Sequence, residues 1–294
     1  MQVNQLKNKL IQQLSTIYKD VSLEQSFDQI AQALIDIMGL SSKVTEIKPF
    51  TNYWSEEDII LITYGDSILK DGEPPLQTLK NFLDHNIENT INSVHILPFF
   101  PYCSDDGFAV IDYSSVNESL GTWQDIEEIS EAYHLMSDLV INHCSSRSAW
   151  FDNFIKGEGL GSDFFFTALP DDNLSDVVRP RTSPLLKEVD TGKGKQFVWC
   201  TFSHDQVDFD FRNPEVLKAF ASIIRQYLDM GVKIFRLDAI AFLWKVVGTQ
   251  SINLPQTHEV VRLLRTLIES TESNPIIITE TNIPNTQNLT YFGN

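Results

Sequence analysis

Two acidic side chains follow apolar segments that have the character of buried strands. Asp238 directly follows the segment 232–237, and Glu280 directly follows the segment 276–279. Because side chains alternate along a strand, Asp238 points to the same side as Ile234 and Arg236, and Glu280 to the same side as Ile276 and Ile278. Retaining glycoside chemistry needs two carboxylates about 5 Å apart, one as nucleophile and one as acid/base. We therefore expect Asp238 and Glu280 to be catalytic.

Arg236 lies two residues before Asp238, on the same side of the expected strand. The simplest alternative to catalysis is a buried ion pair between the two that only orders this end of the fold. The cost of removing both charges from water roughly offsets their attraction, so a gain in stability alone is a poor reason for a buried ion pair there. We favour a functional role. His143, which ends another strand, is equally compatible with a hydrogen-bonded core histidine.

Two further groups of residues could contact a substrate. Asp105 and Asp106 precede Gly107, which by itself is typical of a turn. Arg179 and Arg181 flank a proline, which fixes the backbone between them. The simplest alternative for these arginines is a solvated basic loop. In a chain with 40 Asp and Glu against 22 Lys and Arg, however, the pair predicts an anion-binding clamp.

Composition excludes several classes of protein. The 294 residues are 42% hydrophobic with a net charge of −18, so the chain is neither disordered nor suited to nucleic acid or an anionic membrane. No apolar run reaches about 18 residues, and the amino terminus lacks the apolar core of a signal peptide. Three cysteines without a C-x-x-C pair favour reduced thiols in the cytoplasm over a disulfide framework or zinc site. We expect no metal site.

The elements that must position these residues alternate between strand and helix from about residue 58. Strands are expected at 59–64, 94–97, 139–142, 232–237 and 276–279. Helices are expected at 74–83, 123–134, 213–227 and 256–270. Continuous apolar strands are typical of a parallel sheet that is buried on both faces, as in a doubly wound fold or a (β/α) barrel. No glycine-rich phosphate loop follows the first strand, which favours the barrel.

Three regions of the chain are distinguished by these patterns. Residues 1–54 form an N-terminal helical extension, whose second helix is expected to start at a capping box of Ser22 and Gln25 and to end at Gly39. Residues 55–143 and 213–294 form the catalytic barrel. Residues 144–212 lack a clear pattern and are too many for a simple loop, so we expect a small inserted domain.

The sequence resembles the sucrose phosphorylase group of the alpha-amylase superfamily (glycoside hydrolase family 13). The resemblance covers residues 55–294. It rests on VHILPFFPYCSDDGFAVIDY (94–113), DLVINH (138–143), VVRPRTSPL (177–185), FRLDA (235–239) and ITETN (278–282). It implies an α/β fold, a (β/α)8 TIM barrel of the alpha-amylase type, here truncated after the fifth strand.

The resemblance also implies a reaction. Asp238 matches the nucleophile, Glu280 the general acid/base, and Arg236 a residue that holds the nucleophile. A glycoside phosphorylase of this kind transfers glucose from an α-glucoside to phosphate by double displacement, which gives α-glucose 1-phosphate. The small-molecule glucoside and inorganic phosphate are then the partners, with no cofactor and no metal. A homodimer is compatible with the resemblance.

The substrate pocket is implied in the same way. Asp105, Phe108 and His143 match the glucose subsite, and Arg181, with Arg179 beside it, matches an arginine that meets phosphate or the acceptor. Asn282 stands where sucrose-specific members carry a histidine. The acceptor therefore stays open among fructose, fructose 6-phosphate, glycerate and glycerol.

Two other functions remain as alternatives. One is an α-glucosidase or transglucosidase with the same carboxylates, which would have no reason to carry the arginine pair. The other is a non-catalytic sugar-binding or scaffold protein on an amylase barrel, which typically loses a catalytic carboxylate. The family's third carboxylate lies in a downstream His-Asp motif that is absent from these 294 residues. We therefore expect residues 1–294 alone to be a poor enzyme and a marginal fold.

Overall fold

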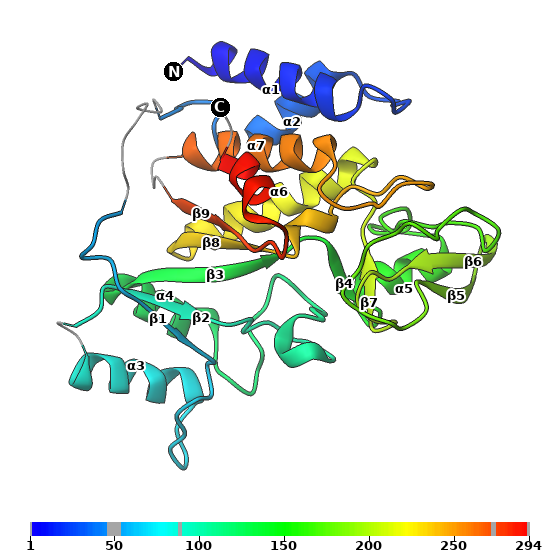
Figure 1. Cartoon of the computed structure of the whole chain (residues 1–294). Helices are drawn as coiled ribbons and strands as arrows, with labels where there is room; N and C mark the ends of the chain where they lie inside the picture. Colours follow the sequence, from blue (N-terminus) through cyan, green and yellow to red (C-terminus); the bar gives the residue numbers. More distant parts are fainter. Residues whose placement is uncertain (1, 46–53, 88–89, 272–274, 293–294) are drawn as a thin grey trace.

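A sheet of five parallel strands forms the centre of the computed structural model, which describes residues 2–45, 54–87, 90–271 and 275–292. The strands lie in the order β1-β2-β3-β8-β9 (Figure 1). Their bounds are Ile60–Thr63 (β1), Ser93–Ile96 (β2), His134–Val140 (β3), Val232–Asp238 (β8) and Ile276–Thr279 (β9). The predicted parallel sheet is confirmed.

The third of these strands starts earlier than predicted. The helix expected over 123–134 ends at Ala132, and His134 already begins β3. Tyr133 between them has extended backbone, with φ −130° and ψ 150°. Leu135 pairs in parallel register with Val94 of β2. Pairing with a neighbouring strand, which a local pattern does not contain, thus overrides the helical periodicity.

The two outer strands of the sheet are more exposed than predicted. Ile62 of β1 is 63% exposed and Ile278 of β9 is 38% exposed, whereas all residues of β2 are buried. Among the described residues, β1 pairs only with β2 and β9 only with β8. The expectation of burial on both faces is therefore wrong for these two strands, because each has a partner strand on one side only.

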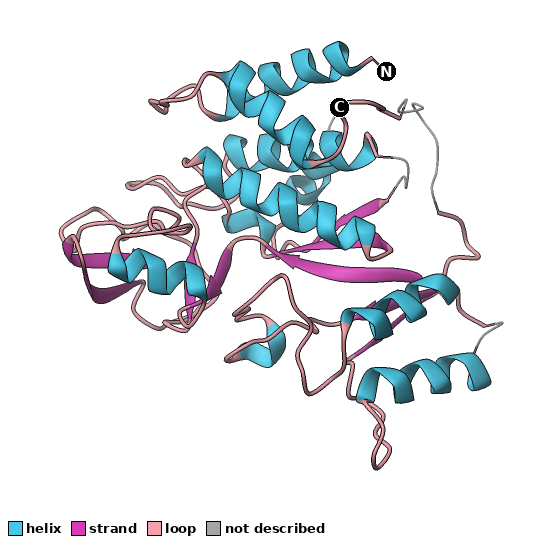
Figure 2. Ribbon diagram, turned by 180° about the vertical axis from the view of Figure 1, so that it is seen from behind, coloured by secondary structure: helices cyan, strands magenta, loops and turns pink. Residues whose placement is uncertain are grey.

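Four helices cover the sheet. Figure 2 shows them beside the strands; they are α3 (Pro75–Asn86), α4 (Trp123–Ala132), α6 (Pro214–Asp229) and α7 (Pro255–Glu269). Three of them begin with proline, whose fixed φ suits the first turn and whose missing N–H is not needed there. Their apolar faces join one hydrophobic core with the strands.

Two N-terminal helices form a further layer. α1 (Val3–Ile17) and α2 (Phe27–Ile37) lie on α7 and α6, on the side away from the sheet (Figure 1). The capping box of α2 is formed by Ser26 and Gln29, so the predicted Ser22–Gln25 box is wrong. Gly39 follows α2 with φ 69°, a left-handed conformation that favours glycine.

The stretch between β3 and α6 contains regular elements. These are β4 (His143–Ser145), α5 (Ala149–Lys156), β5 (Leu186–Thr191), β6 (Gly194–Trp199) and β7 (Gln206–Asp208). β5 and β6 form an antiparallel hairpin, and β4 pairs antiparallel with β7. Whether residues 144–212 make a domain of their own stays a prediction. A short helix, α8 (Asn285–Asn288), follows β9. None of the described helices combines the length and apolarity needed to cross a bilayer.

Candidate active site

Arg236 joins two carboxylates near the carboxyl ends of β3 and β8. Its Nη1 donates to Asp138 Oδ1 at 2.5 Å and to Asp238 Oδ1 at 3.0 Å. Asp138 is fully buried, and its other oxygen lies 2.7 Å from His95 Nε2 on β2. The parallel register of β3 and β8, which sets Asp138 opposite Arg236, brings these groups together. A continuous chain of polar contacts therefore runs across three strands to Asp238.

Glu280 lies beside Asp238 on the adjacent strand. Its backbone N–H donates to Leu237 O at 2.9 Å and extends the parallel pairing of β8 and β9. Its side-chain Oε2 accepts a 2.9 Å hydrogen bond from the backbone N–H of Ala239. Ala239 has φ 50°, in the left-handed region, which turns the chain sharply after Asp238. The two predicted catalytic carboxylates thus meet at the carboxyl edge of the sheet.

The environment of Asp238 disfavours its charged form. The pKa of Asp238 is raised to about 7: burial raises it most, Arg236 lowers it, and Asp138 and Glu280 also raise it. The Arg236 guanidinium keeps a raised pKa because the nearby acidic groups outweigh its own burial. A carboxyl group that changes charge near neutral pH at the end of a barrel-type strand is typical of a catalytic position.

A strained loop after β2 brings Asp105 and Phe108 to the same side. Asp105 and Asp106 have φ 58° and 49°, and Gly107 has φ 107°. A Cβ at Gly107 would lie 2.9 Å from the Pro98 side chain and carbonyl oxygen, so only glycine fits there. The Phe108 ring lies 5.7 Å from the Arg236 guanidinium carbon, in the range of a cation–π contact.

His143 and Asp105 are linked through a residue that sequence reasoning missed. Gln206 Nε2 donates to Asp105 Oδ2 at 2.8 Å and lies 3.2 Å from His143 Nε2. His143 Nε2 also lies 3.1 Å from the carbonyl oxygen of Phe108. Burial lowers the pKa of His143, which favours the neutral imidazole. The structure therefore gathers three of the predicted pocket residues, Asp105, Phe108 and His143, around Gln206 and Arg236.

The two predicted clamp arginines have different surroundings. Arg181 is half exposed, and its Nη2 lies 3.6 Å from Asp105 Oδ1. Arg179 donates to the carbonyl oxygens of Arg181 and Cys200 and to the Ser183 hydroxyl. Arg179 thus braces the loop that carries Arg181, and the structure brings only Arg181 to the other site residues. Asn282 is exposed, two residues beyond Glu280.

A buried polar network behind His143 also escaped sequence reasoning. Asn142 donates to Asp208 Oδ2 at 3.1 Å, and Lys245 Nζ lies 3.1 Å from the same oxygen. Thr201 donates to Asp208 through both its backbone N–H and its hydroxyl. A charged residue within an apolar segment, such as Lys245 in AFLWKVV or Asp138 in LMSDLVI, was the available signal, because an isolated buried charge is too costly to keep without a partner.

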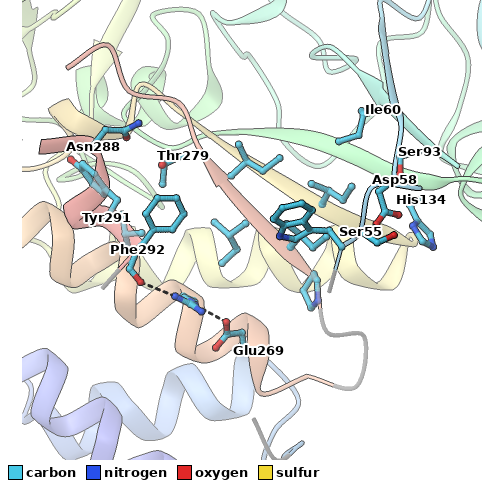
Figure 3. Close-up of a pocket in the computed structure, with 18 of the residues that line it drawn as sticks. Ser55, Asp58, Ile60, Ser93, His134, Glu269, Thr279, Asn288, Tyr291 and Phe292 are labelled. Carbon is cyan, nitrogen blue, oxygen red and sulfur yellow. Dashed lines mark hydrogen bonds and ion pairs between the residues drawn. The ribbon is translucent and has the colours of Figure 1, made fainter. Parts of the chain in front are cut away.

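A cavity of about 900 Å³ opens elsewhere in the molecule. It is lined at the amino ends of four strands by Ile60, Ser93, His134 and Ile276 and along β9 as far as Thr279, and Figure 3 shows Tyr291 and Phe292 on another side of it. The predicted catalytic pair is not among the described residues that line it. In barrel enzymes the chemistry lies at the carboxyl ends of the strands, so this cavity is not the candidate active site.

The chain is similar to known proteins over most of its length. The family model "Alpha amylase, catalytic domain" matches residues 75–294. A glucosylglycerate phosphorylase of Spirochaeta thermophila is 51% identical over 236 residues, which cover 80% of this chain and 40% of that protein. One from Allomeiothermus silvanus is 44% identical over 241 residues, 82% of this chain and 43% of that protein.

A solved structure of a phosphorylase is also similar to this chain in fold. The crystal structure of sucrose 6F-phosphate phosphorylase from Thermoanaerobacter thermosaccharolyticum has a TM-score of 0.69 and 28% identity. The similarity covers 78% of this chain and 48% of that one. The chain thus spans about two fifths of the length of the curated relatives it matches.

Proposed function

The chain belongs to the alpha-amylase family, and we propose that it carries the nucleophile, the acid/base and part of the substrate pocket of a glucoside phosphorylase. The observation that carries this proposal is the meeting of Asp238 and Glu280 at adjacent strand ends, where the amide that follows Asp238 hydrogen-bonds Glu280. Retaining glycosyl transfer needs such a pair. The five strands are then part of a (β/α)8 barrel, with residues 144–212 as its inserted domain.

The reaction proceeds by two displacements. Asp238 attacks the anomeric carbon of the glucoside while Glu280 protonates the leaving oxygen, so that a glucosyl ester forms on Asp238. Glu280, now a carboxylate, accepts a proton from the incoming phosphate. The phosphate oxygen displaces Asp238 and gives α-glucose 1-phosphate with retained configuration. Arg236 holds Asp238 in line, inorganic phosphate is a co-substrate, and no cofactor takes part.

The acceptor half is assigned from charge and from relatives. Arg181 offers a half-exposed cation next to Asp105 at the edge of the site. Such a group suits a phosphate or a carboxylate, which arginine binds with two parallel hydrogen bonds. The relatives described above are named glucosylglycerate phosphorylases, so glycerate is the acceptor that we favour over the neutral sugars and glycerol.

The proposal is tested by supplying glucosylglycerate and phosphate to a version of the protein that also carries the family's third carboxylate, because residues 1–294 alone are expected to be a poor enzyme, and measuring glucose 1-phosphate. We expect phosphate-dependent product that is lost in Asp238→Asn. A glucosyl group trapped on the enzyme should be found on Asp238. Free glucose released at a rate independent of phosphate would instead support a hydrolase with the same carboxylates. A label on any other side chain would refute the assignment of the nucleophile.

A further inference from the structure

Lys245 is a buried cation to which the reaction above gives no role. Its Nζ lies 3.0 Å from Asn142 Oδ1 and 3.1 Å from Asp208 Oδ2, and all three side chains are buried. We propose that Lys245 is a positioning residue that fixes which ring nitrogen of His143 carries the proton. The use that catalysis makes of His143 rests on the proposed function, but the placement of the proton does not.

The first step concerns the orientation of the Asn142 amide. A lysine ammonium can only donate hydrogen bonds and an ionised carboxylate can only accept them. The amide oxygen must therefore face Lys245, and the amide nitrogen must face Asp208, 3.1 Å away. The other orientation would set oxygen against carboxylate and nitrogen against ammonium. Lys245 and Asp208 together allow the Asn142 side chain one orientation.

The second step passes this orientation to His143. The Asn142 nitrogen carries two hydrogens; one goes to Asp208, and the other points to His143 Nδ1 at 3.2 Å. Nδ1 must then accept and carry no proton. In the neutral ring the proton is on Nε2, which lies 3.1 Å from the Phe108 carbonyl oxygen, an acceptor. Gln206 Nε2 lies 3.2 Å from His143 Nε2 and has a second hydrogen beyond the one it donates to Asp105, but only the Nε2–H tautomer keeps both the Asn142 and the Phe108 hydrogen bonds.

Removal of the cation should release this arrangement. In Lys245→Met, Asp208 would be a buried carboxylate without a cation, which is costly enough that the group takes up a proton instead. A protonated Asp208 can donate to the Asn142 oxygen, so the amide can turn over. Its oxygen would then accept from His143 Nδ1, and the ring proton would leave Nε2.

Two-bond proton–nitrogen correlation spectra of the protein with 15N-labelled histidine distinguish the two tautomers. The His143 signals are assigned by their loss in His143→Gln. We expect the Nε2–H tautomer in the wild type and a gain of Nδ1–H in Lys245→Met. Glucosyl transfer should fall roughly ten- to a hundredfold in kcat/KM, as for loss of a charge-assisted hydrogen bond. Lys187→Met is the matched control, because its Nζ donates to the His204 carbonyl and not to Asn142.

The double variant Lys245→Met with Asp208→Asn removes both charges and keeps the measurement available if Lys245→Met does not fold. Its neutral side chain at 208 fits either amide orientation, so Nδ1–H should again appear. An Nδ1–H tautomer in the wild type, or Nε2–H alone in both variants, would overturn the proposal. If no protein forms glucose 1-phosphate while the spectra change as expected, the proposed function fails and the role of Lys245 stands.

Discussion

The backbone amide of Ala239 donates a 2.9 Å hydrogen bond to the Glu280 carboxylate. Because Ala239 directly follows Asp238, the turn that ends β8 also fixes the carboxylate on the next strand. The proposed nucleophile and acid/base are therefore positioned by one backbone feature, a residue with φ 50°. A substitution at Glu280 that keeps an oxygen for the Ala239 amide can therefore remove the proton donor without disturbing Asp238.

Glu280→Gln should remove the proton donor and keep an oxygen that can accept from Ala239. With a natural glucoside, loss of a general acid typically costs 10²- to 10⁴-fold in rate. With α-glucosyl fluoride, whose leaving group needs little protonation, formation of the glucosyl-enzyme should recover. Rapid-quench measurements of fluoride release check this. Asp238→Asn is the control and should stay inactive with both donors; equal recovery in both variants would contradict the assignment.

The raised pKa of Asp238 predicts the acid limb of the activity profile. The nucleophile must be ionised, so kcat/KM should be lost as the pH falls below about 7, the pKa to which burial raises this group. Arg236 lowers that pKa, and a lysine in its place cannot contact Asp138 and Asp238 with the same geometry. In Arg236→Lys the limb should move to higher pH. An unchanged limb would show that another group titrates.

Asp238 also predicts a dependence of stability on pH. Its folded-state pKa, about 7, lies above that of the unfolded chain, so the folded protein holds the proton more tightly. Stability is therefore lost as the pH rises from about 4 to 7. Asp238→Asn removes this loss. The free energy of unfolding of the variant minus that of the wild type should therefore rise by about 2–4 kcal/mol from pH 4 to pH 8. Urea unfolding at both pH values measures it; an equal gain at both would speak against the linkage.

Gly107→Ala should damage the loop that carries Asp105 and Phe108. The new Cβ would lie 2.9 Å from Pro98, at φ 107°, so strain and a clash add up. We expect a loss of about 1–3 kcal/mol and weaker glucoside binding. Gly72→Ala is the matched control, with φ 79° but no atom within 4 Å of the new Cβ. Thermal unfolding and KM distinguish them; equal effects would mean that the loop is not held by this contact.

Arg181→Ala should weaken the phosphate or acceptor half of the reaction. Loss of one charge-assisted hydrogen bond predicts a roughly ten- to hundredfold higher KM for phosphate, with little change in protein stability. Arg179→Ala should instead destabilise its loop, because its guanidinium binds two backbone carbonyls. Initial rates against phosphate concentration, with thermal unfolding of both variants, check this. A phosphate KM unchanged in Arg181→Ala would show that Arg181 belongs to a solvated loop and does not bind phosphate.

Local patterns predicted the strand ends and their carboxylates. Asp238 and Glu280 each follow an apolar run, and strand periodicity alone fixes the side on which they lie. The partners of these residues could not be found in the same way. Asp138 is 98 residues from Arg236, and Gln206 is 101 residues from Asp105, so their contacts depend on strand order and register.

The predicted ends of two helices were wrong for a related reason. The stretch from Trp123 to His134 has helical periodicity, and only the pairing of β3 with β2 shows that its last residue, His134, begins a strand. The Ser22–Gln25 box has the right residue types at the right spacing, as does the observed box four residues later. Sequence spacing alone does not decide between two such boxes.

The layer of α1 and α2 has a consequence for synthesis of the chain. Gln13 of α1 donates to Thr266 of α7, 253 residues away, and Tyr18 packs edge-on against Trp244. After their synthesis these two helices must therefore wait, with apolar faces uncovered, until α7 has been made. Contacts of such long sequence separation form late and slow folding. At about 5–20 residues per second the wait is roughly 13–50 seconds, a window in which chaperones can bind these faces.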